Sequence, residues 1–578
     1  TTTPAPMWKP RTCSLYNTNH YFANSGGGTM TTKPKKTTKK GPMTSRELPM
    51  MNAAEFRERV VGAYNGGTAE MRLEADSDVA RSLIPAGTGA LRDFSYLSPD
   101  IPVFDATQCV GCMDCVTQCP DTAILAKVVA DSDLDKVLAT EEDPTQQDHL
   151  REQFVQTTKY FDVPVRQGKE GGQFSIFIDP TKCKGCAECV EACGVHSALR
   201  MIPKEEETVP QYARDFAFFE GLPYTSTDYI NEKSLVDMML AEKSMLYTGG
   251  AGSCMGCGEA TAIRMMMAAT GFVYGEDSFG IVAATGCNTV YGSTYPYNPY
   301  KVPWMNPLFE NAPADAMGVR LKWDQNGNKE KKLWVLGGDG AMLDIGFQSL
   351  SRMLMSGMNI KVLVLDTQVY SNTGGQASMG TFVGQEAKMS YFGQTVKGKK
   401  ESRKEMGLIA MMHPNVFVAQ VIASNPNHFY KAVMAANEYD GPAIINCYTT
   451  CQPEHGVGDD MAARQAKLAC DTRAFPIFIY DPRKGDTIQE CLDLAGNPAR
   501  NQDWFIDPKT EQPMDFIEFA RSEGRFAKHF DKDGGHSPEM ELAKQERLTN
   551  WRRLQELAGI LKPTPKEKSA APPAAPAT

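Results

Sequence analysis

The chain has 578 residues, of which 42% are hydrophobic and 22% are charged, a balance typical of a globular protein with about two to four domains. Its net charge of −10 at pH 7 argues against nucleic acid as the main partner, because phosphate backbones are bound by concentrated lysine and arginine. No run of about 18 apolar residues occurs, so no membrane-spanning segment is expected.

Both ends of the chain have the composition of disordered tails. Residues 1–50 are rich in Thr, Pro, Gly and Lys, with no Asp or Glu before position 47, and we expect a disordered basic tail. This tail is either dispensable, with Met30 or Met43 as the start residue, or an organelle transit peptide, since transit peptides are basic and poor in acids. Residues 562–578 are rich in Pro and Ala and form the second expected tail.

Residues 51–104 are expected to be a linker or arm. The stretch 53–64 has the spacing of an amphipathic helix, and 93–105 leads toward the cysteine-rich region that follows. Neither stretch contains residues whose pattern indicates a site.

Sixteen cysteines in a chain without a secretory signal indicate metal binding rather than disulfides. Residues 105–205 contain two runs with the spacing C-x2-C-x2-C-x3-C, typical of ferredoxins that hold two 4Fe–4S clusters, where the fourth cysteine of each run serves the other cluster. One cluster is expected to take Cys109, Cys112, Cys115 and Cys193, and the other Cys183, Cys186, Cys189 and Cys119. Zinc, the alternative, suits paired CxxC motifs rather than two runs of four.

Two details of this ferredoxin-like domain depart from the simplest pattern. Gly194 stands where a proline would follow the second run, which should alter the turn but not the ligands. The segment 121–178 between the runs is long and has a polar middle, so we interpret it as an insertion with a solvated surface, ending in a strand over 173–178.

Residues 206–470 have the pattern of an α/β domain with a doubly wound parallel sheet. An apolar run over 333–336 ends in Gly337-Gly338-Asp339-Gly340, an amphipathic stretch covers 345–355, and a second apolar run over 360–365 ends in a polar turn up to Asn372. Both turns follow strands at their carboxyl ends, where such sheets bind ligands. Glycines allow close approach to a diphosphate, and Asp339 can ligate Mg²⁺. A Gly-Asp-Gly turn without any cofactor remains the plainer alternative.

Four more cysteines of this domain fall at the ends or turns of expected elements. The helix is expected over 260–269 and the strands over 279–284, 416–423 and 443–448, with a helix over 428–437. The cysteines are Cys254, Cys257, Cys287 and Cys451. From the residues alone, the pair Cys254 and Cys257 is as readily a metal or redox site as not, whereas Cys287 and Cys451 are more often buried structural thiols.

Taken together, the motifs resemble those of the pyruvate:ferredoxin (flavodoxin) oxidoreductase family, in the carboxy-terminal half of its members. The resemblance spans about residues 85–560 and rests on the two ferredoxin runs, GCGE, ATGC, GDG and YSNTGGQ. It implies thiamine diphosphate, Mg²⁺ and three 4Fe–4S clusters as cofactors. It also implies that Cys254, Cys257, Cys287 and Cys451 hold the third cluster, with Cys447 as the weaker alternative to Cys451.

The same resemblance assigns roles around the thiamine cofactor. Mg²⁺ would be held by Asp339, the Thr367 hydroxyl and the Val369 carbonyl. The diphosphate would be held by Gly338, Gly340, Ala341 and the turn containing Thr367, Gln368, Val369, Tyr370, Ser371 and Asn372. Glu259 and Cys287 would touch the cofactor from the other side. Asn372 would reach the substrate, and capping of its own turn is the alternative role.

The implied activity is oxidative decarboxylation of a 2-oxoacid, with pyruvate first and 2-oxoglutarate or branched-chain acids as alternatives. Coenzyme A takes the acyl group, and electrons pass through three clusters to ferredoxin or flavodoxin. An electron-transfer subunit with a vestigial thiamine site and a non-oxidative decarboxylase are the competing hypotheses. Clusters of this kind also predict a reducing, cytoplasmic setting, or an organelle if the tail is a transit peptide.

Residues 1–84 are too short and polar to be the pyrimidine-side and coenzyme A-contacting domains of the family. We therefore expect a subunit completed by a second chain, in a dimer of heteromers, with a truncated gene product as the alternative. Residues 471–561 are expected to be a packing segment without a catalytic role, with a closing helix over 539–557. His413 and His455 are expected to be structural, although His455 lies near Cys451 and could tune a cluster.

Overall fold

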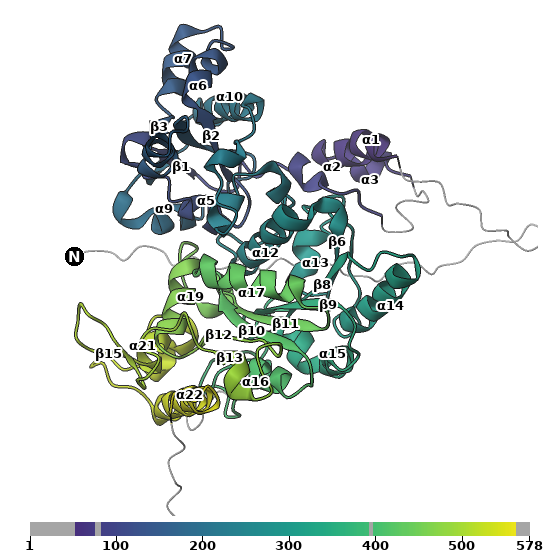
Figure 1. Cartoon of the computed structure of the whole chain (residues 1–578), viewed down its shortest axis with the longest axis vertical. Coiled ribbons are helices and arrows are strands. Elements are labelled where there is room, and N and C mark those ends of the chain that lie inside the picture. Colours follow the sequence, from purple (N-terminus) through teal and green to yellow (C-terminus); the bar gives the residue numbers. More distant parts are fainter. Residues whose placement is uncertain (1–51, 75–82, 392, 394–396, 562–578) are drawn as a thin grey trace, which may run out of the picture. The chain divides into compact units, whose positions relative to one another are not determined.

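The computed structural model describes residues 52–74, 83–391, 393 and 397–561. Both predicted tails, 1–50 and 562–578, lie outside the described residues. Within the described part, no helix combines the length and the apolar character needed to cross a bilayer. The described residues belong to one compact unit, whose elements are labelled in Figure 1, and the domain boundaries at 105, 206 and 471 stay predictions.

An eight-stranded sheet forms the centre of the larger part of the chain. Its strands, in spatial order, are β13 (Leu492–Asp493), β12 (Phe478–Tyr480), β10 (Phe417–Ile422), β11 (Ala443–Tyr448), β9 (Ile360–Asp366), β8 (Lys332–Gly338), β6 (Phe279–Ala283) and β7 (Trp304–Met305). The six strands from β10 to β7 are mutually parallel, and at one edge β12 pairs antiparallel with β10 and β13 pairs antiparallel with β12. The predicted mostly parallel α/β sheet is therefore confirmed.

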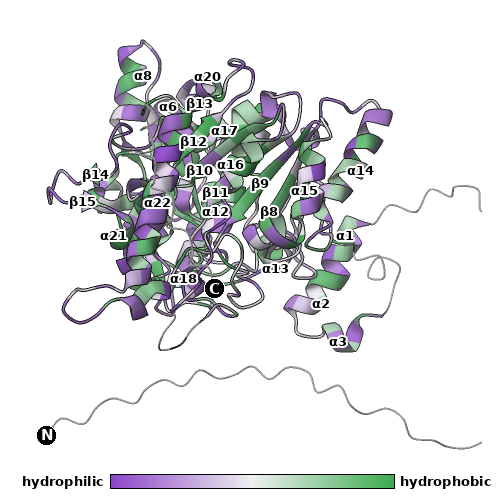
Figure 2. Cartoon of the chain, turned by 90° about the horizontal axis from the view of Figure 1, so that it is seen from below, coloured by the Kyte–Doolittle hydropathy of each residue, from purple (hydrophilic) through white to green (hydrophobic). Residues whose placement is uncertain are grey.

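Helices cover both faces of this sheet. One face packs against α12 (Gly258–Tyr274) and α17 (Pro426–Glu438), and the other against α14 (Ala312–Gln325), α15 (Phe347–Leu354) and α16 (Met406–Met411). Within β8, Trp334 and Leu336 join the first core, whereas Leu333 and Val335 join the second, as the alternation of side chains along a strand requires. Because both faces are buried, the strands are almost uniformly apolar (Figure 2).

Two predicted elements of this domain differ from those observed. The chain after Asp339 begins as a π-helix (η9, Gly340–Ile345) and continues as α15, so the helical segment starts five residues earlier than the expected 345–355. The helix expected over 260–269 is longer at both ends (α12, Gly258–Tyr274), because Gly271, Phe272 and their neighbours continue its apolar, buried character.

The cysteine-rich region has two small sheets. β1 (Asp100–Phe104) pairs antiparallel with β5 (Leu199–Pro203), and α5 (Asp114–Gln118) packs against α9 (Glu188–Cys193). The other sheet has the order β2 (Ile124–Ala130), β4 (Gly172–Ile178), β3 (Val155–Gln156). The strand expected over 173–178 is present as β4. Its partner β2 was missed, because Lys127 interrupts an apolar run; its buried ammonium donates to the Phe219 and Leu222 carbonyls.

The remaining helical segments surround these sheets. The arm contains α1 (Ala53–Glu55), η1 (Phe56–Val61), α2 (Gly62–Asn65) and α3 (Ala69–Arg72), so the helix predicted over 53–64 is present as one continuous helical run. Short helices elsewhere are η2 (Thr88–Leu91), η3 (Ala106–Gln108), α6 (Asp131–Leu138), α7 (Pro144–Arg151), η4 (Thr158–Asp162), α8 (Val163–Arg166), η5 (Gly194–His196), α10 (Thr208–Gly221), η6 (Thr227–Tyr229), α11 (Leu235–Met238), η7 (Glu242–Ser244), η8 (Glu276–Ser278), α13 (Cys287–Gly292), α18 (Gln452–His455) and α19 (Ala462–Asp471).

The carboxy-terminal segment wraps the sheet domain. It contains α20 (Ile488–Cys491), β14 (Phe505–Ile506) paired with β15 (Pro513–Met514), α21 (Phe516–Arg521), η10 (Gly524–His529) and α22 (Pro538–Leu557). The closing helix predicted over 539–557 is thus present as α22. Phe516, Phe519 and Phe526 pack with Phe382 in a separate core, and the aromatic contacts between them attach this segment to the loop after β9.

Candidate functional site

The turns after β8 and β9 meet around one buried carboxylate. Asp339 is fully buried, and its Oδ1 accepts hydrogen bonds from the Thr367 amide (3.2 Å) and hydroxyl (3.1 Å), while Ser378 donates to Oδ2. The Thr367 hydroxyl also lies 3.1 Å from the Val369 carbonyl oxygen. The three predicted Mg²⁺ ligands are therefore brought together, as oxygen donors from adjacent strand ends.

Burial and the nearby Asp366 carboxylate raise the pKa of Asp339 to about 8. A buried acid in that condition is stabilised in its charged form by a bound cation, and Mg²⁺ prefers hard oxygen ligands. The donor set thus fits a divalent cation.

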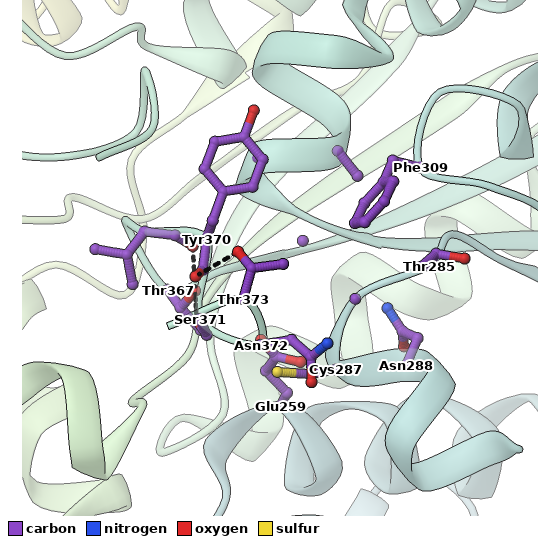
Figure 3. Close-up of a pocket in the computed structure, with 15 residues that line it drawn as sticks. Glu259, Thr285, Cys287, Asn288, Phe309, Thr367, Tyr370, Ser371, Asn372 and Thr373 are labelled. Carbon is purple, nitrogen blue, oxygen red and sulfur yellow. Dashed lines mark hydrogen bonds between the residues drawn. The ribbon is translucent and has the colours of Figure 1, made fainter. Parts of the chain in front are cut away.

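A cavity of about 380 Å³ lies at these two turns, and Figure 3 draws the residues that line it. It is lined by Glu259, Thr285, Gly286, Cys287, Asn288, Phe309, Gly338, Gly340, Ala341, Thr367, Val369, Tyr370, Ser371, Asn372 and Thr373. All the predicted thiamine-site residues line it except Asp339 and Gln368, which are buried behind its wall. The two glycine-containing turns and the GCGE and ATGC segments therefore meet at a single cavity, although they are far apart in the sequence.

The glycines of the GDG turn leave room where a diphosphate would lie. A Cβ built on Gly338 would have only the Leu365 carbonyl oxygen nearby, at 3.8 Å, so open space lies beside this backbone. A Cβ on Gly340 would lie 2.4 Å from the Tyr370 ring, so only glycine allows the ring to close over this turn. This arrangement fits a ligand that is held close to the backbone.

Glu259 enters the cavity from the first turn of α12. Its side chain is buried and accepts a hydrogen bond from the Tyr291 hydroxyl. Burial, with a smaller contribution from the charge of Asp339, raises the pKa of Glu259 to about 8. A carboxyl group in this condition can hold a proton near neutral pH and donate it to a nitrogen or oxygen of a bound ligand.

Asn372 is exposed and is one of the residues that line the cavity (Figure 3). Its side chain has no hydrogen bond to any other described residue in this structure. Hydrogen bonds within the turn are made instead by Thr373, whose hydroxyl donates to Gln376 Oε1 (2.6 Å), and by Ser371, which bonds the Thr367 hydroxyl (2.6 Å). The alternative capping role is thus carried by its neighbours, and the Asn372 amide is available to a ligand.

A buried polar network supports the turn from below. Gln368 has a φ of 58°, which is uncommon for a residue other than glycine. Its Oε1 accepts from Arg525 Nη1 (3.0 Å), and Arg525 Nε pairs with Glu523 (2.6 Å). Asp366 pairs with Arg403 (2.7 Å). Residues of the carboxy-terminal segment, for which only a packing role was predicted, therefore contact the turn predicted to hold Mg²⁺ directly.

His455 belongs to the same network. Its Nε2 lies 2.9 Å from the Thr367 carbonyl oxygen, and burial keeps the pKa of this imidazole well below its usual range. His413, in contrast, bonds Ser351 and the Ile409 carbonyl away from the cavity. Both contacts are structural.

The cysteines of the two ferredoxin runs line two separate cavities, and each cavity takes its fourth thiol from the other run. One cavity, of about 340 Å³, is lined by Cys109, Cys112, Cys115 and Cys193, here called the first thiol set. The other, of about 350 Å³, is lined by Cys183, Cys186, Cys189 and Cys119, here called the second thiol set. The structure thus brings together the two crossed sets of four cysteines that the spacing predicted.

The wall of the first cavity is mostly apolar, whereas Asp121, Lys184 and Glu188 also line the second, and in both cavities backbone amides point at sulfurs. The amides of Gly111, Ala123 and Ala198 donate to Cys109, Cys119 and Cys193 at 3.2–3.4 Å. Burial raises the pKa of the Cys109 thiol to about 11 and that of Cys183 to about 12, so a bound metal would be needed to keep them as thiolates.

Within the described residues, no three His, Cys, Asp or Glu side chains converge as they would on one metal ion. Four thiols spread around a cavity instead fit an iron–sulfur cluster, since its ligands surround a cube rather than a point. A single zinc ion fits these cavities less well.

Cys254, Cys257, Cys287 and Cys451, here called the third thiol set, also lie together. Beyond burial and the charge of Glu259, the groups that raise the pKa of Cys287 are the other three thiols of this set. Cys447 is fully buried within β11, and the charge that perturbs its pKa is that of Asp366 rather than any cysteine. The structure therefore groups Cys451, and not Cys447, with Cys254, Cys257 and Cys287. Cys287 also lines the cofactor cavity.

Several lining residues were not predicted. Thr285, Gly286 and Asn288 follow β6, at the same edge of the sheet as the predicted turns, and their position after an apolar strand was an available signal. Thr373 directly follows the predicted turn. Phe309 comes from the connection between β7 and α14, and nothing in its sequence context indicates that it returns to the cavity.

Comparison with known proteins agrees with this geometry. The family model described as "Thiamine pyrophosphate enzyme, C-terminal TPP binding domain" matches residues 284–447, which contain both cofactor turns. Together with the parallel sheet and the cavity at its carboxyl edge, this match defines a thiamine diphosphate-binding domain.

Relatives extend the similarity to most of the chain. It is 29% identical over 535 residues to the probable pyruvate-flavodoxin oxidoreductase of Escherichia coli (strain K12), covering 79% of this chain and 42% of that protein. It is 26% identical over 593 residues to the pyruvate:ferredoxin oxidoreductase of Moorella thermoacetica, covering 87% and 46%. The pyruvate synthase subunit PorB of Pyrococcus furiosus is 33% identical over 291 residues, covering 49% of this chain and 86% of that subunit.

The chain therefore belongs to the pyruvate:ferredoxin (flavodoxin) oxidoreductase family. It spans about two fifths of the length of the first two relatives. Among solved structures, a 2-oxoglutarate:ferredoxin oxidoreductase from Magnetococcus marinus matches with a TM-score of 0.30 and 24% identity, covering 34% of this chain and 64% of that one, which is too little for a comparison of folds.

Proposed function

We propose that this chain is the thiamine- and cluster-carrying subunit of a 2-oxoacid oxidoreductase. The enzyme would decarboxylate pyruvate oxidatively, form acetyl-coenzyme A and pass electrons to ferredoxin or flavodoxin. One observation carries this proposal: Cys287 lines the cavity that the metal-binding turn also lines, so a redox-active thiol set and a diphosphate site share a wall. A non-oxidative thiamine enzyme has no need of that adjacency.

In this proposal Asp339, the Thr367 hydroxyl and the Val369 carbonyl hold Mg²⁺. The backbone of Gly338, Gly340 and Ala341 and the turn from Thr367 to Asn372 hold the diphosphate. Bound thiamine diphosphate supplies the electron sink for decarboxylation. Glu259 holds a proton beside the cofactor, because its buried carboxyl has a raised pKa and Tyr291 fixes its orientation.

We assign a 4Fe–4S cluster to each of the three thiol sets. The third set lies at the cofactor cavity and would receive electrons first, and the other two would lead them toward the acceptor. Each set supplies four cysteines, the ligand number that such a cluster requires. Iron analysis of anaerobically purified protein tests this count, and one or two clusters per chain would contradict it.

Asn372 is proposed as the residue that meets the substrate, because it is exposed and is one of the residues that line the cavity. Pyruvate is favoured by the names of the relatives, and 2-oxoglutarate and branched-chain acids are the alternatives. Replacing Asn372 with Ala should raise KM for the 2-oxoacid or lower kcat, while thiamine diphosphate binds as before. If kcat and KM stay unchanged, this role is wrong.

We further propose that a second chain supplies the pyrimidine-side and coenzyme A-contacting domains, in a dimer of heteromers. The name of the PorB relative, a pyruvate synthase subunit, supports this arrangement. Ferredoxin or flavodoxin would dock near the first two thiol sets. We also propose a reducing compartment such as the cytoplasm, because clusters of this kind are sensitive to oxygen.

The experiment is anaerobic purification from the source organism, followed by identification of co-purifying chains. Coenzyme A-dependent viologen reduction is then measured with a panel of 2-oxoacids. A stoichiometric partner and activity with pyruvate support the proposal. Iron without activity, and without Mg²⁺-dependent thiamine diphosphate binding, would favour the second candidate, an electron-transfer subunit with a vestigial thiamine site. The convergence of Asp339, Thr367 and Val369 in the structure argues against that candidate.

A further inference from the structure

A buried ammonium group lies between the second and third thiol sets. Lys184 stands between Cys183 and Cys186 in the sequence, and its side chain is 2% exposed. Together with Asp121 it lines the cavity of the second thiol set. Burying a charged side chain costs free energy unless the charge is fully paired. The partners of Lys184 therefore indicate which segments it holds together.

The partners of Lys184 come from two other cluster-binding segments. Its Nζ donates to the Ala251 carbonyl (3.0 Å) and to the carbonyl (2.8 Å) and hydroxyl (3.0 Å) of Ser253, the residue directly before Cys254. It also pairs at 2.7 Å with Asp121, two residues after Cys119. One ammonium group thus joins the segments that carry Cys186, Cys119 and Cys254.

The backbones of these segments also lie very close together. Gly249 has a φ of 75°, and a Cβ built on it would lie 2.3 Å from the Asp121 carbonyl oxygen. A side chain at this position would push the segment that leads to Cys254 away from the second thiol set. Gly249 thus allows the two segments to approach each other, and Lys184 contacts both of them.

We propose that Lys184 is a positioning residue for electron transfer, which fixes the third thiol set against the second and raises the reduction potentials of the clusters they hold. This inference rests on the cluster assignment proposed above. Each cluster gains one negative charge on reduction, and a buried cation stabilises the reduced form more than the oxidised form. Asp121 has the opposite effect on the same cluster, and the two residues therefore predict shifts of opposite sign.

The test is a redox titration of the full chain with its co-purifying partner, monitored by electron paramagnetic resonance. Lys184→Met should move two of the three cluster potentials to more negative values, while the step from the first thiol set stays in place. Lys184→Arg keeps the charge and should restore much of the difference. Asp121→Asn should shift the step of the second thiol set to a more positive value.

Lys127→Met is the matched control. Lys127 is also a buried lysine that donates to two carbonyls, those of Phe219 and Leu222, and no cysteine contributes to its electrostatic environment. This variant should leave all three potentials unchanged.

The outcomes separate this inference from the proposed function. Wild-type protein without 4Fe–4S signals would refute the cluster assignment itself. Fully loaded Lys184→Met protein with unchanged potentials would refute the role of Lys184. If Lys184→Met loses its iron, Asp121→Asn decides, and an unchanged or more negative potential in that variant overturns the inference.

Discussion

Arg525 of the carboxy-terminal segment contacts the proposed metal-binding turn from Thr367 to Asn372. Variants of Arg525 can therefore separate an effect on stability from an effect on cofactor binding. Arg525 is 4% exposed, pairs with Glu523 and donates to Gln368, whose left-handed backbone lies within the turn. Among the described residues, Arg525→Met should leave the buried Glu523 carboxylate with the Tyr448 hydroxyl as its hydrogen-bond donor, and with His455 Nδ1 3.7 Å away. Breaking one side of a buried ion pair typically costs about 3–5 kcal/mol of folding free energy.

The double variant Arg525→Met/Glu523→Gln removes both charges and keeps an acceptor for Tyr448. Since a buried ion pair and its neutral replacement differ little in stability, most of the lost folding free energy should return. Gln368 still lacks its charged donor, and such a hydrogen bond contributes about 1.5–3 kcal/mol. If that energy serves to hold the turn in its binding conformation, Mg²⁺-dependent affinity for thiamine diphosphate falls roughly 10–100-fold.

Isothermal titration calorimetry with thiamine diphosphate and Mg²⁺ measures the affinity, and thermal unfolding measures the stability. Arg473→Met is the control, because Arg473 is an equally buried arginine that donates to the Pro498 and Ala499 carbonyls. It should lower stability without a specific loss of affinity. Wild-type affinity in the double variant would refute the idea that Arg525 holds the turn through Gln368.

Three further results are expected. Asp339→Asn should abolish Mg²⁺-dependent thiamine diphosphate binding in calorimetry. The control Asp344→Asn, which alters a half-buried carboxylate beside the turn, should weaken this binding far less. Equal losses in the two variants would contradict the assignment of Asp339 as the Mg²⁺ ligand. Cys451→Ser should lose the iron of one cluster, and Cys447→Ser should keep it, as iron analysis will show; the reverse result would exchange their roles. Burial lowers the pKa of His428 from 6.5 to about 4, so the unfolded chain binds the proton more tightly and stability falls by up to about 3 kcal/mol as the pH drops through that range. His428→Leu should flatten this dependence in melting curves, and an unchanged slope would disprove the assignment.

The sheet could be predicted from the sequence because its strands are buried on both faces. Such strands are short apolar runs that stop at polar turns, and the runs at 360–365 and 443–448 match β9 and β11 to within one residue. β2 could not be predicted in the same way. Lys127 breaks its apolar run, and only the fold shows that carbonyls more than 90 residues away accept from its ammonium group.

In the site, too, local sequence patterns could be predicted, whereas features that depend on the fold could not. The GDG turn, the second turn and the cysteine runs are local patterns. Spacing indicated the crossed cysteine sets, whereas the resemblance to the oxidoreductase family implied which residues of the two turns belong together. The choice between Cys451 and Cys447 is different, because it depends on where β11 ends. Cys447 lies inside the strand with β9 and β10 on either side, whereas Cys451 follows the strand and reaches the edge of the sheet where Cys287 lies.

Some parts of the site depend on contacts between residues that are far apart in the sequence. No local pattern marks these contacts, so the sequence analysis left them unassigned. Arg525 lies 157 residues from Gln368, and Lys184 lies 69 residues from Ser253. Read as residues in a sequence, both are single basic residues, more often solvated than buried. Their burial is informative, because burying a cation costs free energy unless it is paired, and its partners are then held at fixed positions. Arg525 contacts the predicted cofactor turn through Gln368, and Lys184 joins the segments that carry Cys119, Cys186 and Cys254, so buried basic residues hold together the segments that carry the predicted site.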